Sequence, residues 1–302
     1  MVNISIIIPA YNEAKTLPLL VSKINKSLTE NKIDGEIILV DDGSSDNTKE
    51  IAEELVQKYK TLHFYSHSIN KGLTQALLTC FHHSKGKVIV FLPADLESDP
   101  EEDIPKLMNK MNKGYDLVAG WRQNRKGTKV FASKIYNILS RILFRIKLHD
   151  LNWIKAFDRK IINDLSLRSG WHRYIPIIAH SKGYKIGEVK VNVHKRRFGK
   201  SKFGIKRLLI GALDLLVVKF NLSFSERPML VFGSMGILLS LVGFISGLYL
   251  VYIKLLTGII GNRAPLIFLT VLLILLGIQF FALGFISEFL VDIKESIKNK
   301  RK

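Results

Sequence analysis

Two carboxylates stand two residues apart in the segment 91–100, which reads FLPADLESDP. The segment follows an apolar, β-branched run that predicts a buried strand, and its final proline precedes a helical pattern. If the segment is extended, the side chains of Asp95 and Glu97 point to the same side. Two carboxylates are suitable ligands for Mg²⁺ or Mn²⁺ that carries a diphosphate. Taken alone, the same residues are also typical of a solvated acidic turn before a helix.

Strand and helix patterns alternate through the first 120 residues of the chain. Apolar strands are expected at 4–8, 36–40, 62–65, 88–90 and 116–119, and a helical pattern follows each of the first four. This alternation predicts an α/β fold with a mostly parallel sheet and helices on both faces. Ligands bind such sheets at the carboxyl ends of the strands. Tyr11, Asp42 and Asp95 all fall in loops at those ends.

The positive charge of the chain is concentrated in one segment. The chain has 45 Lys and Arg against 26 Asp and Glu, a net charge of +19, and residues 121–207 hold 23 basic and 4 acidic residues, which accounts for all of it. A basic segment beside an apolar one predicts contact with an anionic lipid bilayer or a phosphorylated lipid. The uncharged stretches that follow argue against a nucleic-acid surface. Cys80 is the single cysteine, so a reducing compartment is expected.

Two stretches near the carboxyl terminus, about 229–253 and 265–287, contain no charged residue. As helices each would be about 35 Å long, against a hydrocarbon core of about 30 Å, and we expect both to span a membrane. Basic residues cluster at 195–207 and 292–302, which predicts that the catalytic domain and both termini are cytoplasmic. The expected layout is an α/β domain at 1–204, an interfacial helix at 205–224 and a two-helix transmembrane hairpin within 225–302.

A further helix is expected at about 130–147. Its apolar residues recur at helical spacing, while Lys134, Arg141 and Arg145 lie off that stripe. A basic amphipathic helix of this kind either packs on the domain or lies on the membrane surface.

Five segments in order resemble glycosyltransferase family 2, which has the GT-A fold, and in particular its polyprenyl-phosphate branch. They are PAYNE at 9–13, VDDGS at 40–44, ADLE at 94–97, GWR at 120–122 and RRFGKSK at 196–202. The resemblance implies metal-dependent, inverting transfer of a hexose from a nucleotide sugar, of the GDP-mannose or UDP-glucose type, to dolichyl or undecaprenyl phosphate. A membrane glycosyltransferase with another acceptor, such as diacylglycerol or a growing glycan, remains the alternative. Relatives that carry such a hairpin also suggest assembly into a homo-oligomer through it.

The resemblance also assigns roles to individual residues. The nucleoside pocket would be lined by Pro9, Tyr11, Glu13, Val40 and Asp42. The diphosphate and its Mg²⁺ or Mn²⁺ would meet Ala94, Asp95 and Glu97, and phosphates would be contacted by Arg122, Arg196 and Lys202. Arg125 is a further phosphate-binding candidate by its residue type alone. For Arg125 a lipid headgroup is an equal alternative. The sequence departs from the family pattern at three positions: Pro93 stands where most relatives have the first acidic ligand, Glu97 where they have glutamine, and Trp153 where they have a small residue.

The chemistry of such a transfer needs little more than these groups. A cation at the leaving diphosphate stabilises the charge that develops there. A phosphate monoester is already ionised and nucleophilic at pH 7, so no general base is required. Arginine side chains suit the acceptor phosphate because they offer it a bidentate fork.

Overall fold

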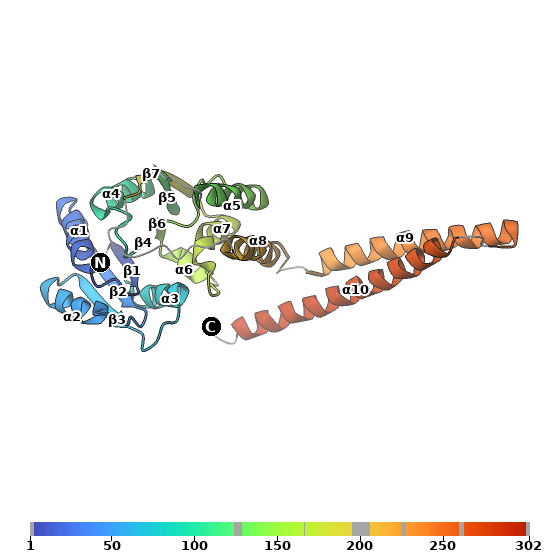
Figure 1. The fold of residues 1–302 in the computed structure, drawn as a ribbon, viewed down its shortest axis with the longest axis horizontal. Coiled ribbons are helices and arrows are strands. Elements are labelled where there is room, and N and C mark those ends of the chain that lie inside the picture. The colour runs from blue at the N-terminus through green and yellow to red at the C-terminus, as the bar shows by residue number, and fades with distance from the viewer. Residues whose placement is uncertain are drawn as a thin grey trace. The chain divides into compact units, whose positions relative to one another are not determined.

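The computed structural model describes residues 3–123, 129–165, 167–194, 206–224, 228–259 and 263–299. The chain divides into two compact units, Met1–Leu215 and Leu216–Lys302. The first unit holds every strand of the described part of the chain, and the second holds two long helices (Figure 1).

The first unit is built around one seven-stranded sheet in the order β3-β2-β1-β4-β6-β5-β7. Its strands are β1 (Ile4–Ala10), β2 (Gly35–Asp41), β3 (Leu62–Ser66), β4 (Val88–Phe91), β5 (Leu117–Gln123), β6 (Lys155–Asp158) and β7 (Ile186–Asn192). Strand β6 runs antiparallel to both of its neighbours, β4 and β5, and all other pairs are parallel. The mostly parallel GT-A-type sheet that the sequence predicts is confirmed.

Helices connect and cover the strands of this unit. They are α1 (Leu17–Glu30), α2 (Thr48–Lys58), α3 (Leu73–His83), α4 (Pro100–Met111), α5 (Lys129–Phe144), α6 (Lys160–Asp164), the 3-10 turn η1 (Trp171–Tyr174) and α7 (Ile175–Ser181). Ile4, Ile6 and Ile8 of β1 belong to the same core as Leu20 and Ile24 of α1. All seven residues of β1 are buried, which is the pattern of a strand covered on both faces.

Two boundaries differ from the sequence prediction, each for a local reason. Strand β1 continues through Pro9, because a proline at the end of a strand gives up only one ladder hydrogen bond, and Pro9 still pairs with Val40. Helix α4 begins at Pro100 itself, the residue that was expected to precede it. Asp99 is its N-cap and accepts a hydrogen bond from the N–H of Glu101 at 3.1 Å, a favourable helix start.

The second unit contains α9 (Pro228–Thr257) and α10 (Ala264–Asn299), which are long and apolar enough to cross a membrane. The candidate spans are Pro228–Thr257 and Ala264–Ile293. An 18-residue stretch within each has a mean hydropathy of 2.1 and 2.8, respectively, and only 17% and 11% of these stretches are buried. The two helices pack closely at Gly277, where an added Cβ would lie 2.7 Å from the carbonyl oxygen of Gly236. The two expected spans therefore fall within α9 and α10. A further helix, α8 (Lys206–Phe224), covers the segment expected to be interfacial.

Candidate active site

The loops after β1, β2 and β4 begin side by side at the carboxyl edge of the parallel strands. Ala10 pairs with Asp41, and the N–H of Leu92 donates to the carbonyl oxygen of Ile7 at 3.1 Å. Asn12, at a φ of 58°, joins the first two loops. Its N–H donates to the hydroxyl of Ser44 at 2.8 Å, and its side-chain oxygen accepts from the N–H of Ser45 at 2.8 Å. The fold thus brings together three of the sequence motifs.

Asp42 is a buried carboxylate held by donors from one loop. The N–H groups of Lys71 and Gly72 donate to it at 2.9 and 2.7 Å, and His67 Nδ1 lies 2.8 Å from its Oδ1. His67 Nε2 is 2.9 Å from the hydroxyl of Thr79, so the ring is fixed between the carboxylate and α3. These donors compensate the burial of Asp42. The result is a preformed acceptor at the end of β2.

The other residues expected to line the nucleoside pocket lie around this edge. Pro9 and Val40 are buried in paired strands, whereas the side chain of Tyr11 is 38% exposed. The N–H of Glu13 donates to Thr48 at 2.9 Å, and the Glu13 carboxylate accepts from the hydroxyl of Thr16 at 2.9 Å. Glu13 therefore also stabilises the start of α1.

The acidic loop is a turn and not the extended segment that the sequence prediction assumed. Leu96 has a φ of 57°, and Asp95 Oδ1 accepts a hydrogen bond from the N–H of Glu97 at 3.1 Å. Strand alternation therefore does not describe this segment, and the assumption that it is extended was wrong. Ala94 and Asp95 are buried, Glu97 is partly exposed, and all three follow β4 directly. The pair still supplies only oxygen ligands, as a hard divalent cation such as Mg²⁺ or Mn²⁺ prefers.

The end of β7 is tied to the acidic loop, because the N–H of His194 donates to the carbonyl oxygen of Glu97 at 2.9 Å. The basic motif that contains Arg196 and Lys202 begins two residues after His194. Both residues lie outside the described part of the chain, as does Arg125. The chain therefore enters the basic segment from beside the acidic loop.

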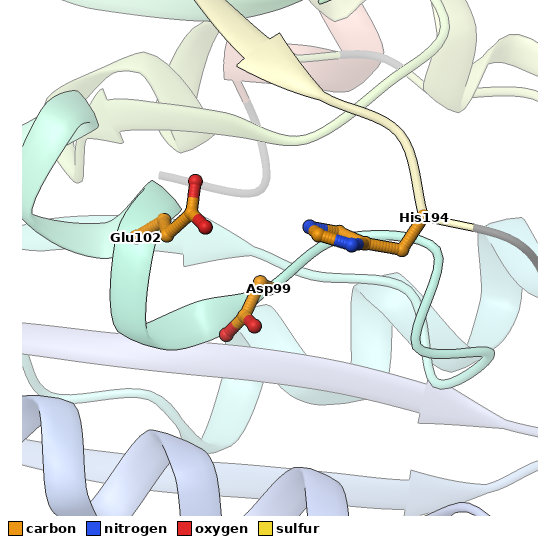
Figure 2. Close-up of side chains that lie close together, drawn as sticks. All are labelled: Asp99, Glu102 and His194. Carbon is orange, nitrogen blue, oxygen red and sulfur yellow. The ribbon is translucent and has the colours of Figure 1, made fainter.

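A second acidic group lies nearby, at Asp99, Glu102 and His194, whose ligand-type atoms are all within 4.8 Å of one another (Figure 2). Lys23 bonds to Asp99 at 2.6 Å, and Lys106 to Glu102 at 3.0 Å. Burial alone would raise the pKa of Asp99, but the hydrogen bonds from Lys23 and from the α4 backbone hold it below its ordinary value. Because both carboxylates are paired with lysines, this cluster stabilises the start of α4.

Arg122 lies on the other side of the edge, on β5, in a bidentate ion pair with Asp150. Its Nε and Nη2 donate to the two carboxylate oxygens at 2.5 and 2.9 Å. Asp150 is buried and also accepts from the N–H of Asn152 at 3.3 Å, so it caps this turn as well. The guanidinium carbon of Arg122 lies 4.7 Å from the ring centroid of Trp153. The pair fixes the orientation of the guanidinium group that was expected to meet a phosphate.

Sequence reasoning missed two side chains at this edge, His67 and Lys155. Lys155 begins β6 and is only 1% exposed. Burial lowers the pKa of Lys155 to about 7, with Asp150 opposing the shift and Arg122 adding to it. Neither residue stands in a recognisable motif, and both become significant only through strand pairings between distant parts of the chain.

Comparison with known proteins places this geometry in context. Residues 5–166 match the protein family described as "Glycosyl transferase family 2". Dodecaprenyl-phosphate galacturonate synthase from Rhizobium johnstonii (strain DSM 114642 / LMG 32736 / 3841) is 33% identical over 94% of this chain and 86% of its own. Undecaprenyl-phosphate 4-deoxy-4-formamido-L-arabinose transferase from Proteus mirabilis (strain HI4320) is 29% identical over 98% of this chain and 90% of its own.

A solved structure shares the fold. It is glucosyl-3-phosphoglycerate synthase from Mycobacterium tuberculosis in complex with Mn²⁺, uridine-diphosphate-glucose and phosphoglyceric acid. The superposition has a TM-score of 0.58 with 20% sequence identity, and it covers 73% of this chain and 79% of the other.

Proposed function

The chain belongs to glycosyl transferase family 2, and we propose that it transfers a sugar from a nucleotide sugar to a polyprenyl phosphate. The observation that carries the proposal is the convergence of Asp42, the acidic loop and Arg122 at one edge of the sheet. The acceptor is supported by the two relatives that match almost the whole chain, both named for polyprenyl-phosphate products or substrates. The apolar helices α9 and α10 fit a lipid acceptor, since they hold the enzyme at a bilayer.

The donor site lies on the β1–β2–β4 side. Asp42 would accept hydrogen bonds from the base, with Tyr11 and Glu13 around the nucleoside. Asp95 and Glu97 would hold Mg²⁺ or Mn²⁺ against the diphosphate, as the oxygen-only ligand set favours. The Mn²⁺ and uridine-diphosphate-glucose that the structural neighbour binds support a divalent metal. Such a cation stabilises negative charge on the leaving nucleoside diphosphate.

The transfer step balances without a general base. An oxygen of the lipid phosphate dianion forms a bond to the anomeric carbon, and the bond from that carbon to the diphosphate breaks. The nucleoside diphosphate departs with the electron pair, and the product is a phosphodiester. Attack opposite the leaving group gives inversion. Arg122, Arg196 and Lys202 would bind the acceptor phosphate, which brings two anionic substrates together despite their mutual repulsion.

The membrane arrangement follows from the charge pattern. Basic residues flank the hairpin at 195–207 and 292–302, so we place the sheet domain and both termini in the cytoplasm. An exposed apolar stripe on α5, with Ile142 71% exposed, supports contact of this helix with the bilayer surface. Lipid phosphate would then reach Arg122 and the basic segment from the headgroup layer.

The decisive experiment uses the full chain in lipid nanodiscs with a panel of radiolabelled uridine and guanosine diphosphate sugars. We expect Mg²⁺- or Mn²⁺-dependent transfer of label to undecaprenyl or dolichyl phosphate from at least one donor. The panel includes galacturonate, glucose and mannose donors. Label that reached diacylglycerol or a glycan, but never the polyprenyl phosphate, would contradict the proposed acceptor.

The metal site has its own test in Asp95→Asn. Loss of a metal ligand should lower turnover about 100-fold or more, because the leaving group loses its counter-charge. Asp34→Asn, an exposed aspartate before β2, is the matched control and should keep full activity. Full activity in Asp95→Asn would remove Asp95 from the metal site.

A further inference from the structure

Lys155 occupies an unusual position for a lysine, because it is buried in β6, an internal strand of the sheet. It pairs with Phe91, the last residue of β4 before the acidic loop, and with Ala119 of β5. Phe157, two residues further on, packs edge-on against Phe81 of α3 with ring centroids 6.0 Å apart. Strand alternation therefore puts Lys155 on the α3 face of the sheet. Its ammonium nitrogen lies 4.9 Å from the centroid of the Phe91 ring.

The charges around Lys155 do not balance. Asp150 is the carboxylate that acts on it most strongly, and Arg122 already binds both oxygens of Asp150. Two cations therefore share one anion in a buried setting, since Lys155 is 1% and Asp150 is 3% exposed. Among the residues that the structure describes, Lys155 has no ion pair of its own. A buried cation without a full partner is costly. When Lys155 is protonated, this site carries one positive charge more than Asp150 can balance.

A second donor beside the same ion pair also lacks a partner. The indole N–H of Trp153 is buried and has no hydrogen-bond acceptor within the described part of the chain. The Arg122 guanidinium lies over the ring of this tryptophan at 4.7 Å. Buried polar groups normally have a hydrogen-bond partner, so the unpartnered indole N–H calls for an explanation.

We propose that Lys155 is a substrate-binding residue, whose ammonium group receives an anionic oxygen group of a substrate. This inference rests on the proposed function and deepens it. The recognised chemistry is a carboxylate or phosphate oxygen. Its source is a carboxylate on the transferred sugar, the diphosphate of the donor or the phosphate of the lipid. Lys155 pairs with Phe91, directly before the acidic loop that is expected to meet the diphosphate.

The test replaces Lys155 with methionine in the full-length chain, which keeps the length of the side chain and removes its charge. Without substrate, we expect the variant to unfold at a temperature at or above that of the wild type, because an uncompensated buried charge is gone. With substrate, we expect the KM for the substrate that carries the anionic group to rise about tenfold or more, and kcat to change less. Lys155→Arg should recover part of that loss.

Three probes identify the source of the anion. A KM change confined to UDP-galacturonate, with UDP-galactose unaffected, assigns a sugar carboxylate. Equal changes for both donors, with weaker UDP binding by calorimetry, assign the diphosphate. A change confined to undecaprenyl phosphate assigns the lipid phosphate. Lys160→Met is the matched control, because Lys160 is exposed and pairs with Asp116 and Asp158 at the outer end of β6, and it should leave all three KM values unchanged.

A purely structural lysine gives the opposite result. Lys155→Met would then lower the unfolding temperature without ligand and leave every KM within about twofold, and this would overturn the inference. If Lys155→Met does not fold, Lys155→Arg decides the matter through the same KM values, which a structural role leaves unchanged. The stabilisation that UDP or UDP-galacturonate gives against heat needs no turnover, so it tests Lys155 even if the wild type transfers no sugar to lipid.

Discussion

The two sides of the sheet edge compensate buried charge in different ways. On the β1–β2–β4 side, carboxylates accept hydrogen bonds mainly from neutral donors. Asp42 accepts from two backbone N–H groups and from His67, and Asp95 accepts from the N–H of Glu97. On the β5–β6 side, Asp150 is held by a guanidinium group with a buried lysine near it. We call these the carboxylate side and the basic side.

The difference matters for the chemistry at this edge. A carboxylate satisfied by neutral donors keeps its full negative charge, so the carboxylate side favours a cation. The basic side has two cations to one anion and favours an anion. A metal-bound diphosphate with a second phosphate beside it carries both kinds of charge. An excess of negative charge on one side and of positive charge on the other therefore suits a reaction between two phosphorylated substrates.

The substitution Asp150→Asn gives the strongest test of this comparison. It removes a negative charge and hardly changes the volume of the side chain. The substitution leaves Arg122 and Lys155 buried without their shared anion, so we expect a loss of about 3–5 kcal/mol in the free energy of unfolding. Urea unfolding in detergent, followed by tryptophan fluorescence, measures it. Asp158→Asn is the control, because its pair with Lys160 is partly exposed and worth about 0–1 kcal/mol. A loss below about 1 kcal/mol for Asp150→Asn would mean that the negative charge of Asp150 contributes little to the stability of the basic side.

The same substitution on the carboxylate side should cost less. Asp42→Asn keeps one carbonyl oxygen for His67 and Lys71, and turns an amide group toward the N–H of Gly72. We expect a loss of about 1–2 kcal/mol, because one neutral hydrogen bond is replaced by two facing donors. Unfolding under the same conditions gives the value, and UDP binding by calorimetry reports the loss of the base acceptor. If Asp42→Asn lowered the free energy of unfolding as much as Asp150→Asn, the two sides would not differ in how they compensate buried charge.

The carboxylate side was largely predictable from the sequence, and the basic side was not. Strands 4–8, 36–40 and 88–90 are read from local apolar runs, and the loops after them place Asp42 and Asp95 at one edge without knowledge of long-range contacts. The amphipathic and apolar helices α5, α9 and α10 are likewise encoded by local periodicity. Local patterns suffice wherever a strand or helix follows its neighbour in chain order.

The basic side depends on contacts that no local pattern encodes. Strand β6 is four residues long and inserts antiparallel between β4 and β5, which buries Lys155 among residues distant in sequence. Arg122 forms its ion pair with Asp150, which lies 28 residues further along the chain. The turn at Leu96 was missed for another reason: a left-handed conformation at a leucine has no sequence signal, unlike one at glycine.

The smallest expected effect distinguishes the two sides by the sign of their pH dependence. On the carboxylate side, Asp103 is buried, accepts from the hydroxyl of Ser98 at 2.7 Å and has its pKa raised by burial to about 6. Between about pH 4 and 6 the folded chain keeps a proton that the unfolded chain has lost, so stability falls as pH rises. We expect about 1 kcal/mol less stability at pH 7 than at pH 5 from this group, and Asp103→Asn should abolish that component.

On the basic side the sign is reversed. Because burial lowers the pKa of Lys155 to about 7, the unfolded chain binds a proton between about pH 7 and 10 that the folded chain does not. Stability should therefore rise with pH through that window, and Lys155→Met should flatten the rise while leaving the slope between pH 5 and 7 intact. Urea midpoints of the wild type and both variants at pH 5, 7 and 9 measure the two slopes separately. Slopes of the same sign would mean that both sides carry the same kind of uncompensated charge, whereas opposite slopes require a buried acid on one side and a buried base on the other.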